Sequence, residues 1–223
     1  FKIVGNAFYG CCGADFMNTY NESVAAAITA IGRDTIKSTM RFIHKKFNNC
    51  KVVYGDTDSV FVWVKLNDEQ KYLCDNNHGE FIKWLWSYGE EMAKQINDNV
   101  NKNGKMRIEM ETIYRDFILV GNKNYYAIKY ENPNEPNRRT KVIKGLSIKK
   151  SNTSKIEAMI LSKFFDMLQA KAKPVEIRRM ILQEYSDIIS GKYDDDVENF
   201  VINTRITKSE YDSTQSQAVH VYL

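Results

Sequence analysis

Two aspartates, Asp56 and Asp58, lie one residue apart within the apolar, β-branched run KVVYGDTDSVFVWV at residues 51–64. A carboxylate beside an apolar core is costly unless it is hydrogen-bonded, paired or bound to a metal. Gly55 and the aspartates are turn-forming residues between two β-rich runs, 51–54 and 59–64, so we predict a β-hairpin. The two carboxylates lie at its tip, where they can converge on one point.

Paired carboxylates are hard, anionic oxygen ligands, and Mg²⁺ is typically held by one or two of them together with substrate phosphates. The same ligands suit phosphoryl transfer by two metal ions about 4 Å apart. The alternative is that Asp-Thr-Asp is simply a turn, because Asp favours turns. The β-rich flanks and the preceding Tyr54 and Gly55 favour the metal site.

A second group of polar residues lies near the N-terminus. Lys2, Asn6 and Tyr9 recur at steps of four and three residues, so they share one face of a helix. A lysine, an amide and an aromatic hydroxyl on one face can hold a triphosphate, position a sugar or template, and flank a base. Gly10 then removes a side chain where a base pair could approach. An ordinary amphipathic helix is the alternative.

The charges are distributed unevenly along the 223 residues, although the net charge is only +4. Residues 123–155 contain nine basic and two acidic side chains, whereas residues 184–198 contain six acids and one lysine. A basic middle segment suits a polyanion such as nucleic acid.

The composition, 43% hydrophobic and 27% charged, is typical of a globular protein. No apolar stretch approaches the roughly 18 residues that cross a membrane, and residues 1–15 do not resemble a signal peptide, so we expect no membrane partner. The four cysteines form no C-x-x-C pair and the three histidines are scattered, which argues against zinc. We expect free thiols in a reducing, intracellular compartment. Because the chain starts at Phe1 inside a patterned segment, we also expect a fragment.

The elements that would position these residues alternate in type, which indicates an α+β fold: an antiparallel sheet packed on helices, then a more helical module after about residue 150. Residues 1–16 indicate the end of a helix that runs into a turn. Residues 67–77 and 131–139 are expected to be irregular, the first as a loop or frayed helix and the second as a proline-containing loop. The spacing of apolar residues predicts helices over 22–47, 81–100, 154–170 and 174–191. Asn21 is expected to cap the first, a capping box from Ser154 to Glu157 to open the third, and Pro174 and Gly191 to mark the ends of the fourth. Strands are predicted over 51–54, 59–64, 106–114, 117–120, 125–130 and 141–146. Residues 199–206 fit a strand or a loop.

Four segments resemble, in order, motifs of the family B DNA polymerases. KIVGNAFYG (2–10) resembles the fingers motif K-x-x-x-N-x-x-Y-G, and YGDTDSVF (54–61) matches the palm motif Y-G-D-T-D-S. Residues 108–130 resemble the palm segment that leads to a K-K-x-Y motif, and KGLSIKKSNTS (144–154) resembles the palm–thumb junction. The resemblance implies the end of a fingers helix at 1–16, a palm at 17–150 and a mainly helical partial thumb at 151–223.

The resemblance also implies roles for individual residues. Asp58 would be the catalytic metal ligand and Asp56 a supporting one, in a site that holds two Mg²⁺ ions when complete. Lys2 would contact the triphosphate of the incoming dNTP, Asn6 would brace that pocket and Tyr9 would pack against the nascent base pair. Glu111 would be an acidic palm residue near the metals. Contacts with primer–template DNA are implied for Gly10, Lys123, Tyr126, Lys144, Lys149 and Lys150.

The chain departs from the family pattern in two places. Where the family has K-K-R-Y or K-K-K-Y, this chain has Lys123-Asn124-Tyr125-Tyr126, which predicts a weaker phosphate grip or one shared with Lys129. The family's first palm motif, which carries another metal-binding aspartate, would lie upstream of Phe1, as would most of the fingers and the proofreading exonuclease. We therefore expect this chain to be inactive without the missing N-terminal part, supplied in cis or as a separate chain.

Two other interpretations are open. The chain could be a natural split subunit that needs a partner chain, or a non-catalytic DNA-binding module on a palm scaffold. Intact Asp58, Lys2 and Tyr9 count against the module, because binding to the DNA backbone requires none of them. The many Asn and Lys residues and the deviations from cellular motifs favour a virus or mobile element as the source. A viral enzyme would act in the host nucleus or cytoplasm.

Overall fold

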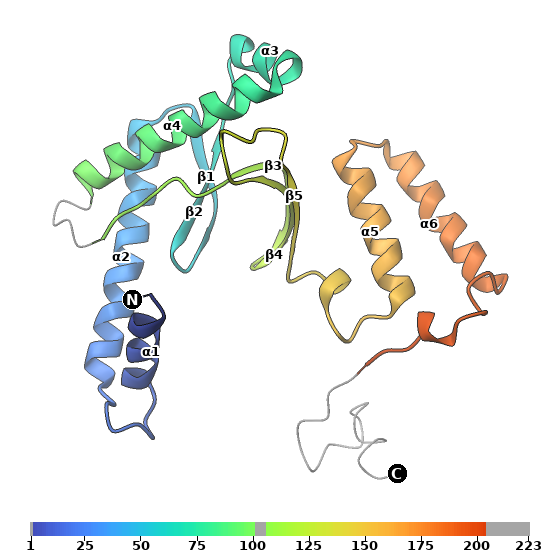
Figure 1. Ribbon diagram of the computed structural model, residues 1–223, viewed down its shortest axis with the longest axis horizontal. Coiled ribbons are helices and arrows are strands. Elements are labelled where there is room, and N and C mark those ends of the chain that lie inside the picture. The colour runs from blue at the N-terminus through green and yellow to red at the C-terminus, as the bar shows by residue number, and fades with distance from the viewer. Residues whose placement is uncertain (1, 101–105, 204–223) are drawn as a thin grey trace. The chain divides into compact units, whose positions relative to one another are not determined.

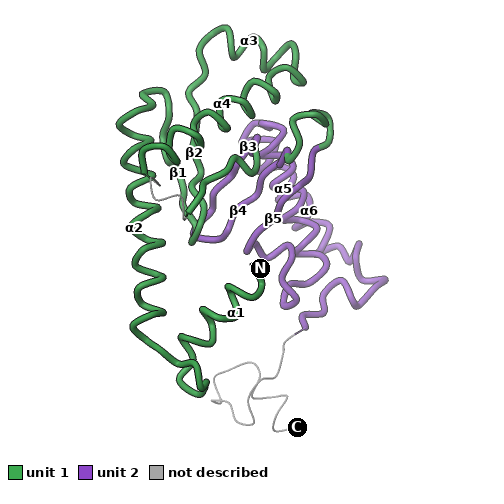
Figure 2. The backbone as a smooth tube through the Cα atoms, turned by 60° about the vertical axis from the view of Figure 1, so that its left-hand side comes forward, with its two compact units in different colours: residues 1–113, 131–138 green, residues 114–130, 139–223 purple. Residues whose placement is uncertain are grey.

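The computed structural model describes residues 2–100 and 106–203 of an α+β protein with two small antiparallel sheets (Figure 1). The chain divides into two compact units, residues 1–113 with 131–138 and residues 114–130 with 139–223 (Figure 2). The predicted division into fingers, palm and thumb stays a prediction. In the described part of the chain, no helix is long and apolar enough to span a bilayer.

Asparagine side chains cap the start of three helices in the first unit. Asn21 accepts a hydrogen bond from the Val24 N–H at the start of α2, as expected. The loop or frayed helix expected at 67–77 is instead a capped helix, α3, because Asn67 and Gln70 form a reciprocal capping box. The next helix starts three residues earlier than predicted. The helices of this unit are α1 (Lys2–Gly13), α2 (Glu22–Lys46), α3 (Asp68–Asn76) and α4 (His78–Asn99).

The predicted hairpin is formed by β1 (Cys50–Asp56) and β2 (Ser59–Val64), which pair antiparallel. Cys50 lies opposite Val64 and Asp56 lies opposite Ser59, and the register shifts once, at Val53. Asp56 therefore belongs to the strand and not to the loop that we predicted from residue 55 onward. Gly and Asp favour turns, but here cross-strand hydrogen bonds extend the ladder past them.

The hairpin is packed on two helices. Ile43 of α2 and Met92 and Ile96 of α4 form a buried cluster, against which Val52, Val60 and Val62 of the hairpin pack. The alternating valines thus face a helical layer, which fixes the hairpin in register because a slip of one residue would expose them.

The second unit holds a three-stranded sheet in the order β3-β4-β5. The bounds predicted for strands 106–114 and 117–120 are wrong. Residues 107–112 lie in neither sheet, and a single strand begins at Ile113. Ile113 is also the residue at which the chain passes from the first unit to the second. The sheet and its helices are β3 (Ile113–Gly121), β4 (Asn124–Tyr130), β5 (Thr140–Lys144), the 3₁₀ helix η1 (Ser147–Lys149), α5 (Lys155–Gln169), α6 (Pro174–Ile189) and the 3₁₀ helix η2 (Val197–Asn199).

The core of the second unit forms where β4 meets α5. Tyr126 is fully buried and stacks on Phe165, with ring centroids 5.3 Å apart and Leu146 beside them. Gly191, which was predicted to end the helix that starts at Pro174, follows the end of α6 and has φ 76. The described part of the region expected at 199–206 is the end of η2 and irregular chain to residue 203. Its last three residues lie outside the described residues.

Candidate active site

The tip of the β1–β2 hairpin is a two-residue turn, Thr57-Asp58, between the paired residues Asp56 and Ser59. Thr57 has φ 43, a left-handed conformation that is uncommon for a β-branched residue. The Asp58 N–H donates to the Asp56 carbonyl at 2.5 Å, and the Ser59 hydroxyl donates to the same carbonyl at 3.1 Å. These bonds hold the turn in a strained conformation, as often found where a side chain must be aimed.

The two aspartates of the tip have different surroundings. The Asp56 carboxylate is half-buried and accepts a hydrogen bond from the Thr57 hydroxyl at 3.1 Å. Asp58 is exposed. Asp56 is therefore hydrogen-bonded within the turn, whereas Asp58 faces outward. This difference fits the predicted roles of support and metal ligand, which stay predictions.

The base of the hairpin is held by polar contacts to the helices as well as by its valines. His44 of α2 accepts a hydrogen bond from the Val52 N–H through Nε2 at 3.2 Å. Tyr88 of α4 donates to the Asn49 side chain at 3.0 Å, and burial raises the pKa of this tyrosine to about 12. The loop end of the hairpin extends away from α4, so the fixed base carries a projecting tip (Figure 1).

Asp56 and Asp58 fit Mg²⁺ as hard oxygen donors, but they do not make a full ligand set. Among residues 2–100 and 106–203, no three His, Cys, Asp or Glu side chains come together as a metal-binding group. Glu111, which is exposed, therefore does not complete a cluster with the two aspartates. A third carboxylate would have to come from elsewhere.

The predicted nucleotide-binding residues lie on α1. Asn6 and Tyr9 are exposed, while the side chain of Lys2, the first residue of α1, lies outside what the structure describes. A Cβ added at Gly10 would meet nothing within 4 Å, so the helix surface is open there. The nucleotide contacts of this face stay predictions.

The basic residues predicted to contact DNA lie at the surface of the second unit. Lys123 is exposed in the turn between β3 and β4, and Lys144 is exposed at the end of β5. Lys149 and Lys150 are exposed at and just after η1. Their positions leave them accessible to a phosphate backbone, and the contacts themselves are untested.

Tyr126, the other side chain predicted to contact DNA, is buried in the core of the second unit, and its contact with DNA stays a prediction. Its buried hydroxyl donates to Asp166 at 2.5 Å and lies 3.0 Å from Gln169 Oε1. Lys141 lies 2.6 Å from the same Asp166 oxygen, with its ammonium 5.7 Å from the centre of the Tyr126 ring. Burial and the Asp166 carboxylate both raise the pKa of Tyr126. The structure thus gives this side chain a supporting place in the core.

Sequence reasoning missed Lys141 and Asp166 as partners of Tyr126. In the sequence Lys141 is one of a run of basic residues, and Asp166 lies 40 residues from Tyr126 on an ordinary amphipathic helix. No local spacing signals a contact over that separation.

Comparison with known proteins shows the class to which this fold and hairpin belong. The chain matches DNA polymerase family B over residues 1–223, and it belongs to that family.

Three relatives illustrate the range of the similarity. The DNA polymerase of Paramecium bursaria Chlorella virus NY2A is 33% identical over 193 residues, covering 83% of this chain and 20% of that protein. DNA polymerase 1 of Aeropyrum pernix is 28% identical, covering 98% of this chain and 20% of that protein. The DNA polymerase alpha catalytic subunit of Sterkiella nova is 27% identical, covering 97% of this chain and 14% of that protein. The chain thus spans a fifth or less of the length of these relatives.

Proposed function

We propose that this chain is the palm-containing part of a DNA-directed DNA polymerase that transfers a nucleotide from a dNTP to a primer 3′-hydroxyl during replication. The observation that carries the proposal is the braced hairpin tip, which presents the Asp58 carboxylate from a Y-G-D-T-D-S segment. The family match along the whole chain supports it. We assign residues 1–16 to the fingers, 17–150 to the palm and 151–223 to a partial thumb.

In this proposal Asp58 holds Mg²⁺, and Asp56 supports the turn through its bonds to Thr57 and Ser59. When bound, two such ions would neutralise the charge that develops on the transferred phosphate. Lys2, Asn6 and Tyr9 hold the triphosphate, brace the pocket and pack against the new base pair. These groups act by positioning and electrostatics. The chain therefore contributes by holding the backbone that carries them in a fixed place.

Binding of primer–template DNA is assigned to exposed basic residues and to the open surface of α1. Phosphate contacts by lysines supply affinity without reading sequence. The accessible positions around β5 and η1 support this assignment. The assigned residues are Gly10, Lys123, Lys144, Lys149 and Lys150.

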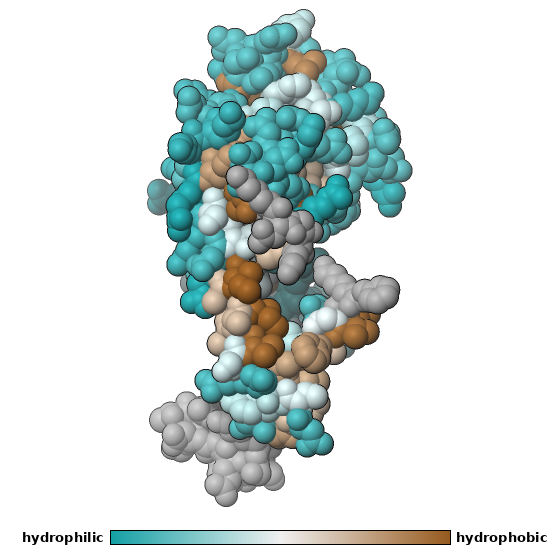
Figure 3. Space-filling view, turned by 90° about the vertical axis from the view of Figure 1, so that its left-hand side faces the viewer, coloured by the Kyte–Doolittle hydropathy of each residue, from teal (hydrophilic) through white to brown (hydrophobic). Residues whose placement is uncertain are grey.

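We further propose that the chain needs the remainder of a polymerase, in cis or as a second chain, to be active. The two aspartates lack a third carboxylate among the described residues. In addition, α1 and α2 expose apolar side chains such as Ile3, Phe8 and Ile31. Figure 3 shows that hydrophobic surface, coloured brown, is present on this face of the molecule. Exposed apolar surface of this kind commonly marks a contact surface. The remainder of the polymerase would cover it.

The test is the substitution Asp58→Ala in the complete polymerase. We expect loss of primer extension with duplex binding nearly unchanged, because Asp58 is exposed and contributes a metal ligand and not packing. Asp75→Asn, at an exposed carboxylate on α3, is the matched control and should extend primers normally. Near wild-type extension by Asp58→Ala would refute the assignment.

A further inference from the structure

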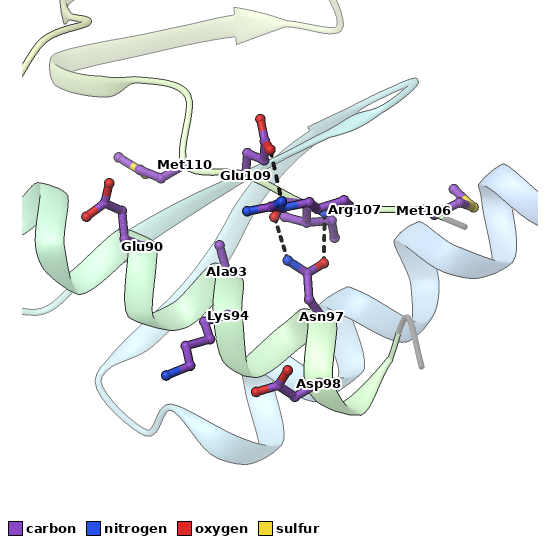
Figure 4. Close-up of a pocket in the computed structure, with 10 residues that line it drawn as sticks. Glu90, Ala93, Lys94, Asn97, Asp98, Met106, Arg107, Glu109 and Met110 are labelled. Carbon is purple, nitrogen blue, oxygen red and sulfur yellow. Dashed lines mark hydrogen bonds and ion pairs between the residues drawn. The ribbon is translucent and has the colours of Figure 1, made fainter. Parts of the chain in front are cut away.

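A short segment, residues 106–112, precedes β3 without joining either sheet, and exposed and half-buried side chains alternate along it from Arg107 to Thr112. One side chain takes the place of a neighbouring strand. Asn97 of α4 donates from Nδ2 to the Ile108 carbonyl at 2.7 Å and accepts the Ile108 N–H through Oδ1 at 2.8 Å (Figure 4).

This pair of hydrogen bonds specifies the residue type at position 97. In an antiparallel ladder, a residue exchanges both its N–H and its C=O with the residue opposite. A primary amide carries a donor and an acceptor side by side, so it can satisfy both groups of one residue. A carboxylate could accept but not donate, and an aliphatic side chain could do neither.

Two further contacts hold the same side of the segment. The Thr35 hydroxyl of α2, which lies 2.8 Å from the Ile31 carbonyl, is also 3.6 Å from Met106 Sδ. Met110 lies over Gly89 of α4, where an added Cβ would come within 2.5 Å of its sulfur. Gly89 thus permits the close approach of the segment to the helix. Residues 106, 108 and 110 are therefore the ones that face the helices.

Because side chains alternate along an extended chain, residues 107, 109 and 111 lie on the opposite side. Arg107 and Glu109 are exposed and form an ion pair at 3.3 Å, and Figure 4 shows Glu109 on the side away from α4. Glu111, also exposed, is the next residue of this outer side. A slip by one residue would exchange Glu111 for Met110 or Thr112.

We propose that Asn97 is a positioning residue that locks the register of this segment and thereby fixes the outward placement of Glu111. The proposal rests on the polymerase function proposed above and on the role of acidic palm residue that the family resemblance implies for Glu111. In this proposal Asn97 acts through the segment and makes no direct contact with substrate or metal.

The lock is tested first by amide hydrogen exchange on the 223-residue chain. Asn97→Leu keeps the side-chain size and removes both hydrogen bonds, so we expect the Ile108 amide to exchange at least about tenfold faster. Asn99→Ala is the matched control, because Asn99, on the same helix, donates to the Gln95 carbonyl of that helix and not to Ile108. That variant should leave Ile108 exchange unchanged. Unchanged exchange in Asn97→Leu would overturn the lock.

The role in positioning is tested by primer extension with the complete polymerase. We expect Asn97→Leu to lower kcat about tenfold and to raise the Mg²⁺ concentration for half-maximal rate, as Glu111→Gln should. If Asn97 acts through Glu111, the double variant should be no slower than Glu111→Gln alone. Additive losses with an unchanged Mg²⁺ dependence would show a structural role only and overturn the proposal.

Failure of the two proposals can be told apart. If Asp58→Ala extends primers as well as the wild type, the polymerase assignment fails, and Ile108 exchange alone decides whether Asn97 locks the segment. If Asp58→Ala is inactive while Asn97→Leu extends primers normally, the polymerase assignment stands and the positioning role of Asn97 is overturned.

Discussion

The two aspartates of the hairpin tip differ because one belongs to a strand and the other to a turn. Asp56 is paired across the ladder with Ser59 and bonded to Thr57, whereas Asp58 lies beyond the last pair. Turn and strand preferences in the sequence predicted the tip, whereas the motif resemblance implied unequal roles for the two residues. The strand assignment of Asp56 depended on the ladder, which turn propensity alone does not reveal.

Tyr126 illustrates a residue whose place is decided by tertiary packing. Burial opposes ionisation of its partner Asp166, but hydrogen bonds from Lys141 and Tyr126 outweigh burial, and the net pKa of Asp166 is lowered. A carboxylate with a lowered pKa adds stability above its unfolded pKa of about 4, and that stability is lost as pH falls through the folded pKa.

We predict that Tyr126→Phe lowers the free energy of unfolding by about 1 kcal/mol at pH 7, because it removes one hydrogen bond to a carboxylate that is nearly half exposed. The variant should also lose less stability than the wild type between neutral and acidic pH, since its Asp166 pKa lies closer to the ordinary value. Urea denaturation at both pH values measures this. Tyr72→Phe, at an exposed tyrosine of α3, should change neither quantity.

Among the elements, the helix α5 shows what a capping motif can and cannot predict. The spacing Ser154 to Glu157 predicted a reciprocal capping box. The Ser154 hydroxyl does accept a hydrogen bond from the Glu157 N–H at 3.3 Å. The return bond from the Glu157 side chain, which α3 shows for Gln70, is absent from this described helix.

We therefore predict unequal effects of truncating the two residues. Ser154→Ala should lower the free energy of unfolding by about 1 kcal/mol, because it leaves the first turn of α5 without its acceptor. Glu157→Ala should cost less than about 0.5 kcal/mol, since only the favourable charge at the helix N-terminus is lost. Chemical denaturation of both variants makes the comparison, and equal losses would show that the full box forms.

At the scale of the whole molecule, charge separates along the chain without making the net charge large. The basic residues of segment 123–155 belong mostly to the second unit, whereas the carboxylates of the hairpin tip belong to the first. A protein that binds DNA through such lysines loses affinity as salt rises, because each phosphate contact releases counterions.

We predict that Lys149→Ala with Lys150→Ala weakens duplex binding regardless of sequence and reduces the slope of log K against log salt by about 1 to 2. The matched control is Lys71→Ala with Lys83→Ala, which removes the same charge from lysines paired with Asp68 and Glu80. Fluorescence anisotropy across a salt series measures both. A slope equal to that of the wild type would exclude backbone contacts at Lys149 and Lys150.

The sequence by itself determined those features that depend on neighbouring residues. Asn21 as a helix cap, Pro174 and Gly191 at the ends of α6, and the hairpin around Asp56 and Asp58 all follow from local backbone preferences. The family motifs are likewise contiguous runs of residues, so they are recognisable in the sequence itself.

Tertiary structure alone decided the features that join distant residues. The bond from Asn97 to Ile108, the burial of Tyr126 against Asp166 and the brace from His44 to Val52 link separate elements. Residues 106–112 have the pattern of a strand, yet the backbone of Ile108 bonds to a side chain of α4 and not to a neighbouring strand. Propensity describes a residue with its neighbours along the chain, whereas these contacts depend on which elements fold against one another.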